Sequence, residues 1–342
     1  MKWRFQMSEE LTVVAVDAMG GDNAPGELVK GAVNAVKDED NIKVILVGKE
    51  DAIKKELGKY EYDENKIEIR NATEIIATDE VPTIAVRRKK DSSLVVAMKM
   101  VKQGEADAVV SAGSSGAILV GGQAIVGRIK GIDRPPLAPL IPTSDGVALL
   151  IDCGANVDAR SSHLVQFAQL GSIYMEYVMG VKNPRVGLLN IGAEEEKGNS
   201  LTKETYPLLK ELDNINFIGN IEAREIPEGA ADVIVCDAFA GNCILKFYEG
   251  VGNMLKAKLT SVYKKSAKNG MGYLMVKKDL NKTLKAFKTD EYGGAPLLGL
   301  NGLVVKTHGS AKAIEVCTSI KQCVTFKQQH IKDRVTEHIA VK

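Results

Sequence analysis

The sequence predicts an α/β protein, an α/β/α sandwich around a mostly parallel sheet. Three observations support this prediction: short β-branched runs alternate with amphipathic stretches, the runs are apolar without interruption, and most of them end in a polar loop rich in glycine. Uninterrupted apolar strands are typical of parallel sheets, because helices cover both faces of such sheets.

Six strand–helix pairs are expected along the chain. The strands are 11–16, 43–48, 106–111, 146–152, 185–192 and 231–237, and the helices that follow them are 26–37, 50–59, 116–129, 161–180, 200–212 and 241–259. The proline-rich stretch 131–142 is either a crossing between two lobes or a rigid loop within one large domain that spans 11–342. Residues 1–10 are expected to form a flexible extension.

Composition excludes several classes of protein. The 342 residues carry a formal net charge of +1 and 5% aromatic residues, which argues against a nucleic-acid-binding protein. Five cysteines without a CxxC pair indicate a reducing compartment and no disulfides, and four scattered histidines suggest no metal site. No apolar run has the length of a signal-peptide core or a membrane span, so a cytoplasmic location is expected.

Five of the expected strands end in loops that combine glycine with Asp, Asn or Ser: 17–25, 111–117, 152–158, 191–200 and 236–243. Strand-to-helix turns often need glycine and a helix cap, so any single loop can be an ordinary turn. Ligands bind at the carboxyl ends of strands in open α/β sheets. Taken together, the five loops therefore indicate a shared polar cleft that binds an anion.

The first two loops offer backbone and hydroxyl donors for a phosphate-like anion. The first contains Gly20 and Gly21, with Asn23 as a helix cap and Pro25 in the first helical turn; the second contains Ser111, Gly113, Ser114 and Ser115. Neither a GxGxxG nor a GxxxxGK[ST] motif occurs in the chain, so no nucleotide cofactor is expected. A serine nucleophile is disfavoured, because no GxSxG motif is present.

The later loops offer charged side chains. Lys197 follows three glutamates and is either a solvated lysine or a cation that stabilises negative charge in the cleft. Asp237, Asn242 and Lys246 lie at the start of a helix. Asp237 is either a simple helix cap or a site residue, and Lys246 is either a surface residue or a site residue. Cys236 and Cys243 are expected to be small buried residues rather than nucleophiles.

Basic residues are concentrated in two places. The segment 251–288 holds ten lysines and one acidic residue, interleaved with apolar residues, which predicts a helical arm that lies on an anionic membrane, meets an acidic partner or forms a dimer. The run Arg87–Lys90 is either a solvated helix end or a contact for an acidic protein.

Eight motifs extend the interpretation beyond single loops. In chain order they are VDAMGGDNAP, SAGSSGA, GRIKGIDRP, DCGANVD, GLLNIGAEEEKGN, ADVIVCDAFAGN, YGGAPLLG and HGSA. This ordered set, from about Val13 to about Ala311, closely resembles the PlsX family of phosphate acyltransferases. The resemblance implies an isocitrate/isopropylmalate-dehydrogenase-like fold, distantly related to phosphotransacetylases, and a homodimer.

The resemblance also implies the reaction: an acyl group moves from acyl-[acyl carrier protein] to inorganic phosphate, giving an acyl phosphate for phospholipid synthesis. A membrane-bound glycerol-3-phosphate acyltransferase would use that product, and the enzyme would be peripherally membrane-associated. Acidic acyl carrier protein could dock on Arg87–Lys90 or on Arg128, Lys130 and Arg134.

The resemblance suggests roles for the site residues. Gly20, Gly21, Asn23, Ser111 and Gly113 would cradle phosphate, Lys197 would stabilise the transition state, and Asp17, Asp237, Asn242 and Lys246 would orient the reactants. Ser115 and His308, the latter in the HGSA motif, complete the expected binding residues.

Two loops depart from the family pattern. Ser114 and Ser115 replace Asn and Thr, which puts an amide contact at position 114 in doubt, and Ala238 and Ala240 replace Gly and Thr. Three alternatives stay open: a phosphotransacetylase that uses acyl-CoA, a non-catalytic membrane scaffold, and a dehydrogenase, the last weakened by the missing dinucleotide motif.

Overall fold

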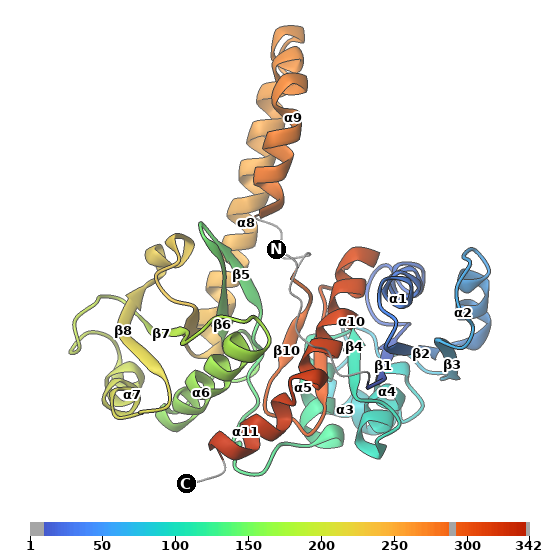
Figure 1. The fold of residues 1–342 in the computed structure, drawn as a ribbon, viewed down its shortest axis with the longest axis horizontal. Helices are drawn as coiled ribbons and strands as arrows, with labels where there is room; N and C mark the ends of the chain where they lie inside the picture. Colours follow the sequence, from blue (N-terminus) through green and yellow to red (C-terminus); the bar gives the residue numbers. More distant parts are fainter. Residues whose placement is uncertain (1–9, 287–291, 340–342) are drawn as a thin grey trace. The chain divides into compact units, whose positions relative to one another are not determined.

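The computed structural model describes residues 10–286 and 292–339, and the chain divides into two compact units with a separate sheet in each (Figure 1). The first unit contains the described residues of Met1–Pro139, Gln169–Asn183 and Asp290–Lys342, and the second those of Leu140–Ala168 and Pro184–Thr289. One crossing between the units thus falls inside the proline-rich stretch 131–142. The expected extension 1–10 lies outside the described residues except for Glu10.

The first unit is built on a six-stranded sheet in the order β10-β11-β4-β1-β2-β3. Of these strands, only β10 runs antiparallel to its neighbour. The strands are β1 (Thr12–Asp17), β2 (Ile42–Gly48), β3 (Ile67–Asn71), β4 (Ala108–Ser111), β10 (Ala295–Leu297) and β11 (Leu303–Lys306).

Helices cover this sheet on both faces. On one face lie α1 (Gly26–Asp38), α2 (Glu50–Leu57) and α10 (Ala313–Gln328); α4 (Ser93–Gln103) and α5 (Ser115–Gly121) lie against the other. The unit also contains α3 (Pro82–Arg88), a π-helical turn (Gly122–Val126) that continues α5, and α11 (Ile331–Ile339).

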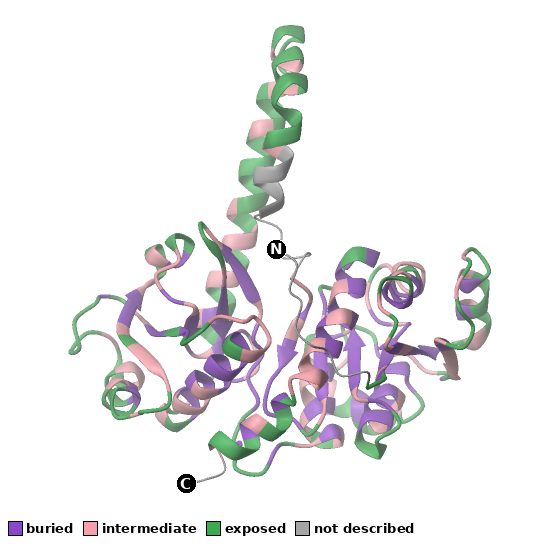
Figure 2. Ribbon diagram, viewed as in Figure 1, coloured by how far each residue is buried: buried purple, intermediate pink, exposed green. Residues whose placement is uncertain are grey.

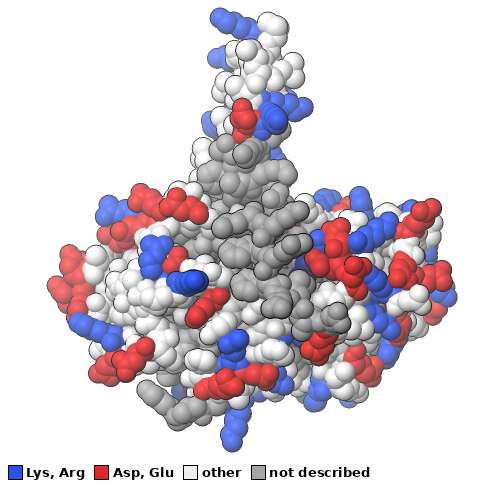
Figure 3. Space-filling model, viewed as in Figure 1, with Lys and Arg blue, Asp and Glu red and all other residues white. Residues whose placement is uncertain are grey.

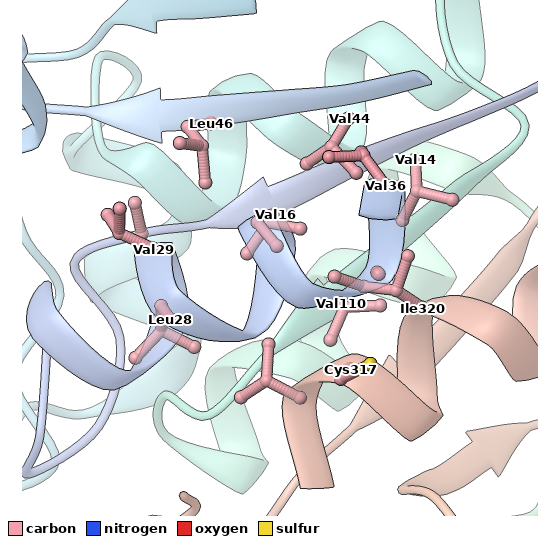
Figure 4. Packing of buried hydrophobic residues seen from close by; sticks show 14 of the residues in the cluster. Val14, Val16, Leu28, Val29, Val36, Val44, Leu46, Val110, Cys317 and Ile320 are labelled. Atoms are coloured by element: carbon pink, nitrogen blue, oxygen red, sulfur yellow. The ribbon is translucent and has the colours of Figure 1, made fainter. Parts of the chain in front are cut away.

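The main core of this unit lies between the sheet and helices α1 and α10 (Figure 4). Val14 and Val16 of β1 pack there with Val110 of β4 and with apolar residues of both helices. Each such side chain, fully buried, contributes about 1.5–3 kcal/mol relative to an exposed one. The two helices approach closely, because a Cβ atom on Gly31 of α1 would lie 2.6 Å from the Cβ atom of Val316.

The second unit is built on a five-stranded sheet in the order β5-β6-β9-β7-β8, and of these strands only β5 is antiparallel. The strands are β5 (Leu140–Thr143), β6 (Gly146–Ile151), β7 (Arg185–Asn190), β8 (Asn216–Glu222) and β9 (Val233–Val235). Helix α7 (Ser200–Lys210) packs on β7 and β8, and α6 (Ser161–Tyr177) begins in this unit and ends in the first.

An arm of two helices, α8 (Ala238–Tyr263) and α9 (Ala267–Ala286), extends from the second unit (Figures 1 and 2). The rings of Tyr263 and Tyr273 pack with centroids 4.8 Å apart, and the Asn269 amide donates to the Val262 carbonyl oxygen at 2.9 Å. Most of the described arm is exposed. In the part of the chain that the structure describes, no helix is long and apolar enough to span a bilayer.

The predicted α/β class and all six predicted strand–helix pairs are confirmed. The strands belong to two sheets instead of one, so two of the five polar loops lie in the first unit and three in the second. The sequence reading missed β3, β5, β8, β10 and β11. Most of these are sheet edges, where a short or partly polar strand suffices.

Candidate active site

Three loops of the first unit meet at Gly20 and Gly21. They follow β1, β4 and β11, at the carboxyl edge where open α/β sheets bind ligands. A Cβ atom on Gly20 would lie 2.5 Å from Oδ2 of Asp17 and 2.8 Å from the backbone nitrogen of Gly113. Gly21 has φ +89°, and a Cβ atom there would lie 2.8 Å from the Gly309 carbonyl oxygen. The glycine pair is therefore required for the close approach of the three loops.

The Asp17 carboxyl group holds the loop that follows β4. The Ser111 hydroxyl donates to Oδ2 of Asp17 at 2.6 Å, and the Gly113 N–H donates to the same hydroxyl at 3.0 Å. Burial raises the pKa of Asp17, although hydrogen bonds from Ser111 and Ser93 act in the opposite direction. The Gly113 N–H is thus engaged within the loop, and Ser111 is fully buried. Ser111 and Gly113 therefore hold the loop after β4 in place by internal hydrogen bonds.

Asn23 ties the loop after β11, residues 307–312, to the loop after β1. Its side-chain amide donates to the carbonyl oxygens of Ser310 at 2.9 Å and Ala311 at 3.2 Å. The prediction that Asn23 caps the following helix is wrong, because α1 begins directly after Pro25 and has no side-chain cap. The amide instead satisfies two carbonyl groups of the neighbouring loop.

His308 and Ser115 are the exposed polar side chains of this loop cluster that were expected to bind substrate. Nδ1 of His308 accepts a hydrogen bond from the Ser310 N–H at 3.3 Å and lies 2.8 Å from the Ser310 hydroxyl. A backbone N–H can only donate, so the neutral ring carries its proton on Nε2. The Ser114 hydroxyl caps α5 by accepting from the Ala117 N–H at 3.5 Å. Among the described residues none engages the Ser115 hydroxyl, which is left free for a ligand.

In the second unit, Asp152 connects the loop after β6 to the start of α8. Its Oδ2 accepts from the N–H and the side-chain amide of Asn156, at 2.8 and 2.7 Å. The Asn156 carbonyl oxygen accepts from the Ala238 N–H at 3.1 Å. A Cβ atom on Gly241 would collide with the Asp152 carbonyl oxygen, so only glycine allows α8 to lie this close.

Asp237, Asn242 and Lys246 lie on the first turns of α8. Oδ1 of Asp237 accepts from the Ala240 N–H at 2.9 Å, so the interpretation of Asp237 as a helix cap is confirmed. Asn242 is exposed, and Lys246, one turn later on the same face, pairs with Glu249 at 2.9 Å. This helix start therefore presents an amide and an ion-paired lysine to solvent.

Two amides fasten the loop that carries Lys197. Asn190 donates to the Lys197 carbonyl oxygen at 3.1 Å, and Asn220 donates to the Glu194 carbonyl oxygen at 2.8 Å. Glu195 is paired with Lys210 at 2.7 Å. The Lys197 ammonium group is exposed and has no carboxylate partner among the described residues. The loop thus presents an exposed ammonium group that forms no ion pair in the described part of the chain, on a backbone held by two amide hydrogen bonds and beside the glutamates that precede it.

Comparison with known proteins decides the family. A family model described as "Fatty acid synthesis protein" matches residues 12–334. "Phosphate acyltransferase" of Clostridium novyi (strain NT) is 47% identical over 96% of this chain and 99% of its own length. "Phosphate acyltransferase" of Clostridium acetobutylicum is 48% identical, over 96% and 98%. The chain belongs to the phosphate acyltransferase (PlsX) family. It is accordingly an acyltransferase of fatty acid and phospholipid synthesis.

Solved structures with a similar fold include phosphotransacetylases. "EutD phosphotransacetylase from Staphylococcus aureus" has a TM-score of 0.60 at 17% identity and covers 94% of this chain and 95% of its own. A phosphotransacetylase from Streptococcus pyogenes has a TM-score of 0.62 at 17% identity, over 93% and 94%. At this identity the likeness concerns the fold alone.

The expected site residues of this phosphate acyltransferase fall into two clusters. The first unit brings together Asp17, Gly20, Gly21, Asn23, Ser111, Gly113, Ser115 and His308, and the second holds Lys197, Asp237, Asn242 and Lys246. Asp152, Asn156 and Asn190 are positioning residues that were not predicted from the sequence. The DCGANVD and GLLNIGAEEEKGN motifs contained them, but their side-chain hydrogen bonds depend on how each loop folds back on itself.

The cysteines offer no thiolate nucleophile in the core of this phosphate acyltransferase. All five are free, and burial raises the pKa values of Cys153 and Cys236 well above the usual range. The prediction that Cys236 is buried is confirmed; for Cys243 it is wrong, because this residue lies on the exposed side of α8. No cluster of three metal-ligating side chains occurs within the described ranges.

Proposed function

We propose that the chain transfers a fatty acyl group from acyl-[acyl carrier protein] to inorganic phosphate. A phosphate oxygen attacks the thioester carbonyl carbon, the C–O bond forms, and the C–S bond breaks. The carrier-protein thiolate leaves and takes up the proton that the attacking hydrogen phosphate loses, and acyl phosphate is the second product. The interlocked loops around Gly20 and Gly21 carry this proposal, because they build a rigid polar surface at the ligand-binding edge of the sheet.

The residue roles follow from which groups are free and which are engaged. In the first unit, the N–H of Gly21, the Ser115 hydroxyl and Nε2 of His308 would bind phosphate. Asp17, Ser111, Asn23 and Gly113 would hold the loops that carry these donors.

In the second unit, Lys197 and Asn242 would stabilise the carbonyl oxygen as negative charge develops. Asp237 would fix the start of α8, and Lys246 would orient the reactants. Phosphate is already nucleophilic near pH 7, so this scheme needs positioning and charge stabilisation rather than a Ser-His-Asp triad.

The deciding experiment compares two acyl donors with purified full-length chain. Free thiol release from acyl-carrier protein should require inorganic phosphate, and the acyl phosphate should be trapped as a hydroxamate by hydroxylamine. Matched reactions with acyl-CoA separate the proposal from a phosphotransacetylase-like enzyme. Faster turnover of acyl-CoA would favour that alternative. Absence of phosphate-dependent thiol release with both donors would favour a non-catalytic scaffold.

The same proposal includes a location and partners. The lysine-rich arm would bring a homodimer to the cytoplasmic face of an anionic membrane, where a membrane-bound glycerol-3-phosphate acyltransferase would consume the acyl phosphate. The described arm exposes lysines along its length (Figure 3) together with apolar side chains such as Leu255 and Met275, so it offers cations and apolar groups to an anionic membrane surface.

A further inference from the structure

Helix α3 presents an exposed strip that combines apolar and basic side chains. Val81, which precedes the helix, is 58% exposed and Ile84 is 50% exposed. Arg87 and Arg88 follow one turn later and are also exposed. Residues spaced by three or four positions share one helix face, so the four side chains form a continuous strip. Large apolar side chains exposed next to cations are a feature of interaction surfaces.

The strip is attached to the loop cluster of the first unit. Pro82, the first residue of α3, packs on Gly116 of α5, where a Cβ atom would lie 2.5 Å from Cγ of the proline. Gly116 directly follows Ser114 and Ser115. A protein bound to the strip would thus rest on the element that carries part of the proposed phosphate site.

The arginines are available to a partner. Neither Arg87 nor Arg88 forms an ion pair within the described residues, whereas Lys89 is engaged with Glu80 at 2.7 Å and with the Ile75 carbonyl oxygen. Lys89 also holds the pKa of Glu80 below its usual value. Within the run Arg87–Lys90, Lys89 thus has a structural role, whereas Arg87 and Arg88 remain available to a partner.

The second basic group of the sequence lacks this combination. Arg128 donates to the Asp133 carbonyl oxygen, and its own carbonyl oxygen accepts from Asn301. Ile129 and Ile132 beside it are buried. Arg128 thus organises its own loop, and no large apolar side chain is exposed between residues 126 and 140.

We infer that the strip of Val81, Ile84, Arg87 and Arg88 is the docking surface for the acidic carrier protein that delivers the acyl group. This inference rests on the proposed function and deepens it. Complementary charge accelerates encounter, and the apolar pair supplies a small contact that dissociates readily. A carrier must leave after each turnover, so a small, transient interface fits the task.

The test is a double charge reversal, R87E/R88E, assayed with acyl-carrier protein and with acyl-pantetheine. The KM for acyl-carrier protein should rise about tenfold or more, because two attractive contacts become repulsive. The KM for acyl-pantetheine and for phosphate should stay unchanged. The matched control is K37E/K55E, which reverses two exposed lysines in last helical turns of the same unit.

The apolar half of the strip is tested with V81S/I84S, which should also raise the KM for the carrier-bound donor alone. Equal KM values for wild type, R87E/R88E and V81S/I84S would overturn the docking surface. An equal rise of the KM for acyl-carrier protein in K37E/K55E would also overturn the docking surface, because the net charge of the protein would then be the cause. The docking surface would likewise be overturned if R87E/R88E reduced vesicle binding or dimerisation and left the KM for acyl-carrier protein unchanged. If the wild type fails to release carrier thiol, the proposed function itself fails, independently of this comparison.

Discussion

At the scale of single residues, the site depends on side chains that never reach its surface. Asp17 and Ser111 are buried. At position 20 only glycine fits, because a Cβ atom there would collide with Asp17 and Gly113. The sequence motifs predicted a role in the site for these three positions. They could not distinguish a group that touches a ligand from one that holds the loop, because both occur in the same glycine-rich pattern.

Asp17→Asn should change how stability depends on pH. The folded-state pKa of Asp17 is raised, so the native state keeps a proton that the unfolded chain loses above about pH 3.9. The wild type should lose stability as pH rises from there through the raised pKa, with a slope of up to about 1.4 kcal/mol per pH unit from this group. The asparagine amide of the variant carries no such proton. Urea unfolding across this interval should show the stability difference shifting in favour of the variant as pH rises; a pH-independent difference would contradict it.

Lys197→Ala should lower kcat about 100-fold, because removal of one donor to developing charge typically has an effect of that size. Asn190→Asp should lower kcat less, since it removes only the donor to the Lys197 carbonyl oxygen and leaves the ammonium group in place. Lys203→Ala, an exposed lysine on α7, is the control. Steady-state acyl phosphate synthesis checks all three. Near-normal turnover by Lys197→Ala would remove this residue from the mechanism.

At the scale of elements, the strand–helix pairs were predictable because uninterrupted apolar runs alternate with amphipathic stretches. The missed strands are different: β10 contains a proline within three residues, and β5 contains another. Such strands form because a neighbouring strand offers its edge, which is a tertiary effect. The arm was predicted from its lysines, and the structure adds that its apolar residues are exposed.

Reversing four arm lysines, in the variant K256E/K258E/K264E/K265E, should abolish sedimentation with vesicles that contain phosphatidylglycerol. Each lysine near an anionic surface contributes about 1 kcal/mol of attraction, and four reversals replace that attraction by repulsion at four positions. Neutral phosphatidylcholine vesicles and added salt provide the controls. A variant with four exposed lysines reversed outside the arm should sediment as the wild type does: Lys30, Lys37, Lys55 and Lys203. Unchanged sedimentation of the arm variant would exclude the lysines as the membrane contact.

At the scale of the whole molecule, neither unit is a continuous piece of chain. Within the described residues the chain crosses between the units after residues 139, 168 and 183, and one of these crossings lies within α6. The sequence could indicate the first crossing from its prolines. It could not indicate the crossing within α6, because a helix that runs from one unit into the other has no compositional signal.

Inorganic phosphate should stabilise the entire chain. A ligand at ten times its Kd adds about 1.4 kcal/mol to the free energy of unfolding, which corresponds to a rise in Tm of roughly 2 °C for a chain of this size. Chloride at matched ionic strength is the control. The S115A/H308A variant changes two exposed side chains, so it should keep its Tm in chloride and lose the rise in phosphate. An equal rise in the variant would place the anion elsewhere.

The exposed apolar surface of the arm has a chemical consequence. Met254, Met271 and Met275 are 53%, 64% and 86% exposed, so thioethers make up a large part of this surface. Oxidation converts a thioether into a polar sulfoxide and is reversed by dedicated reductases. Oxidants that reach the arm would therefore make its apolar face polar without altering a single residue of the two sheets, and reduction would restore it.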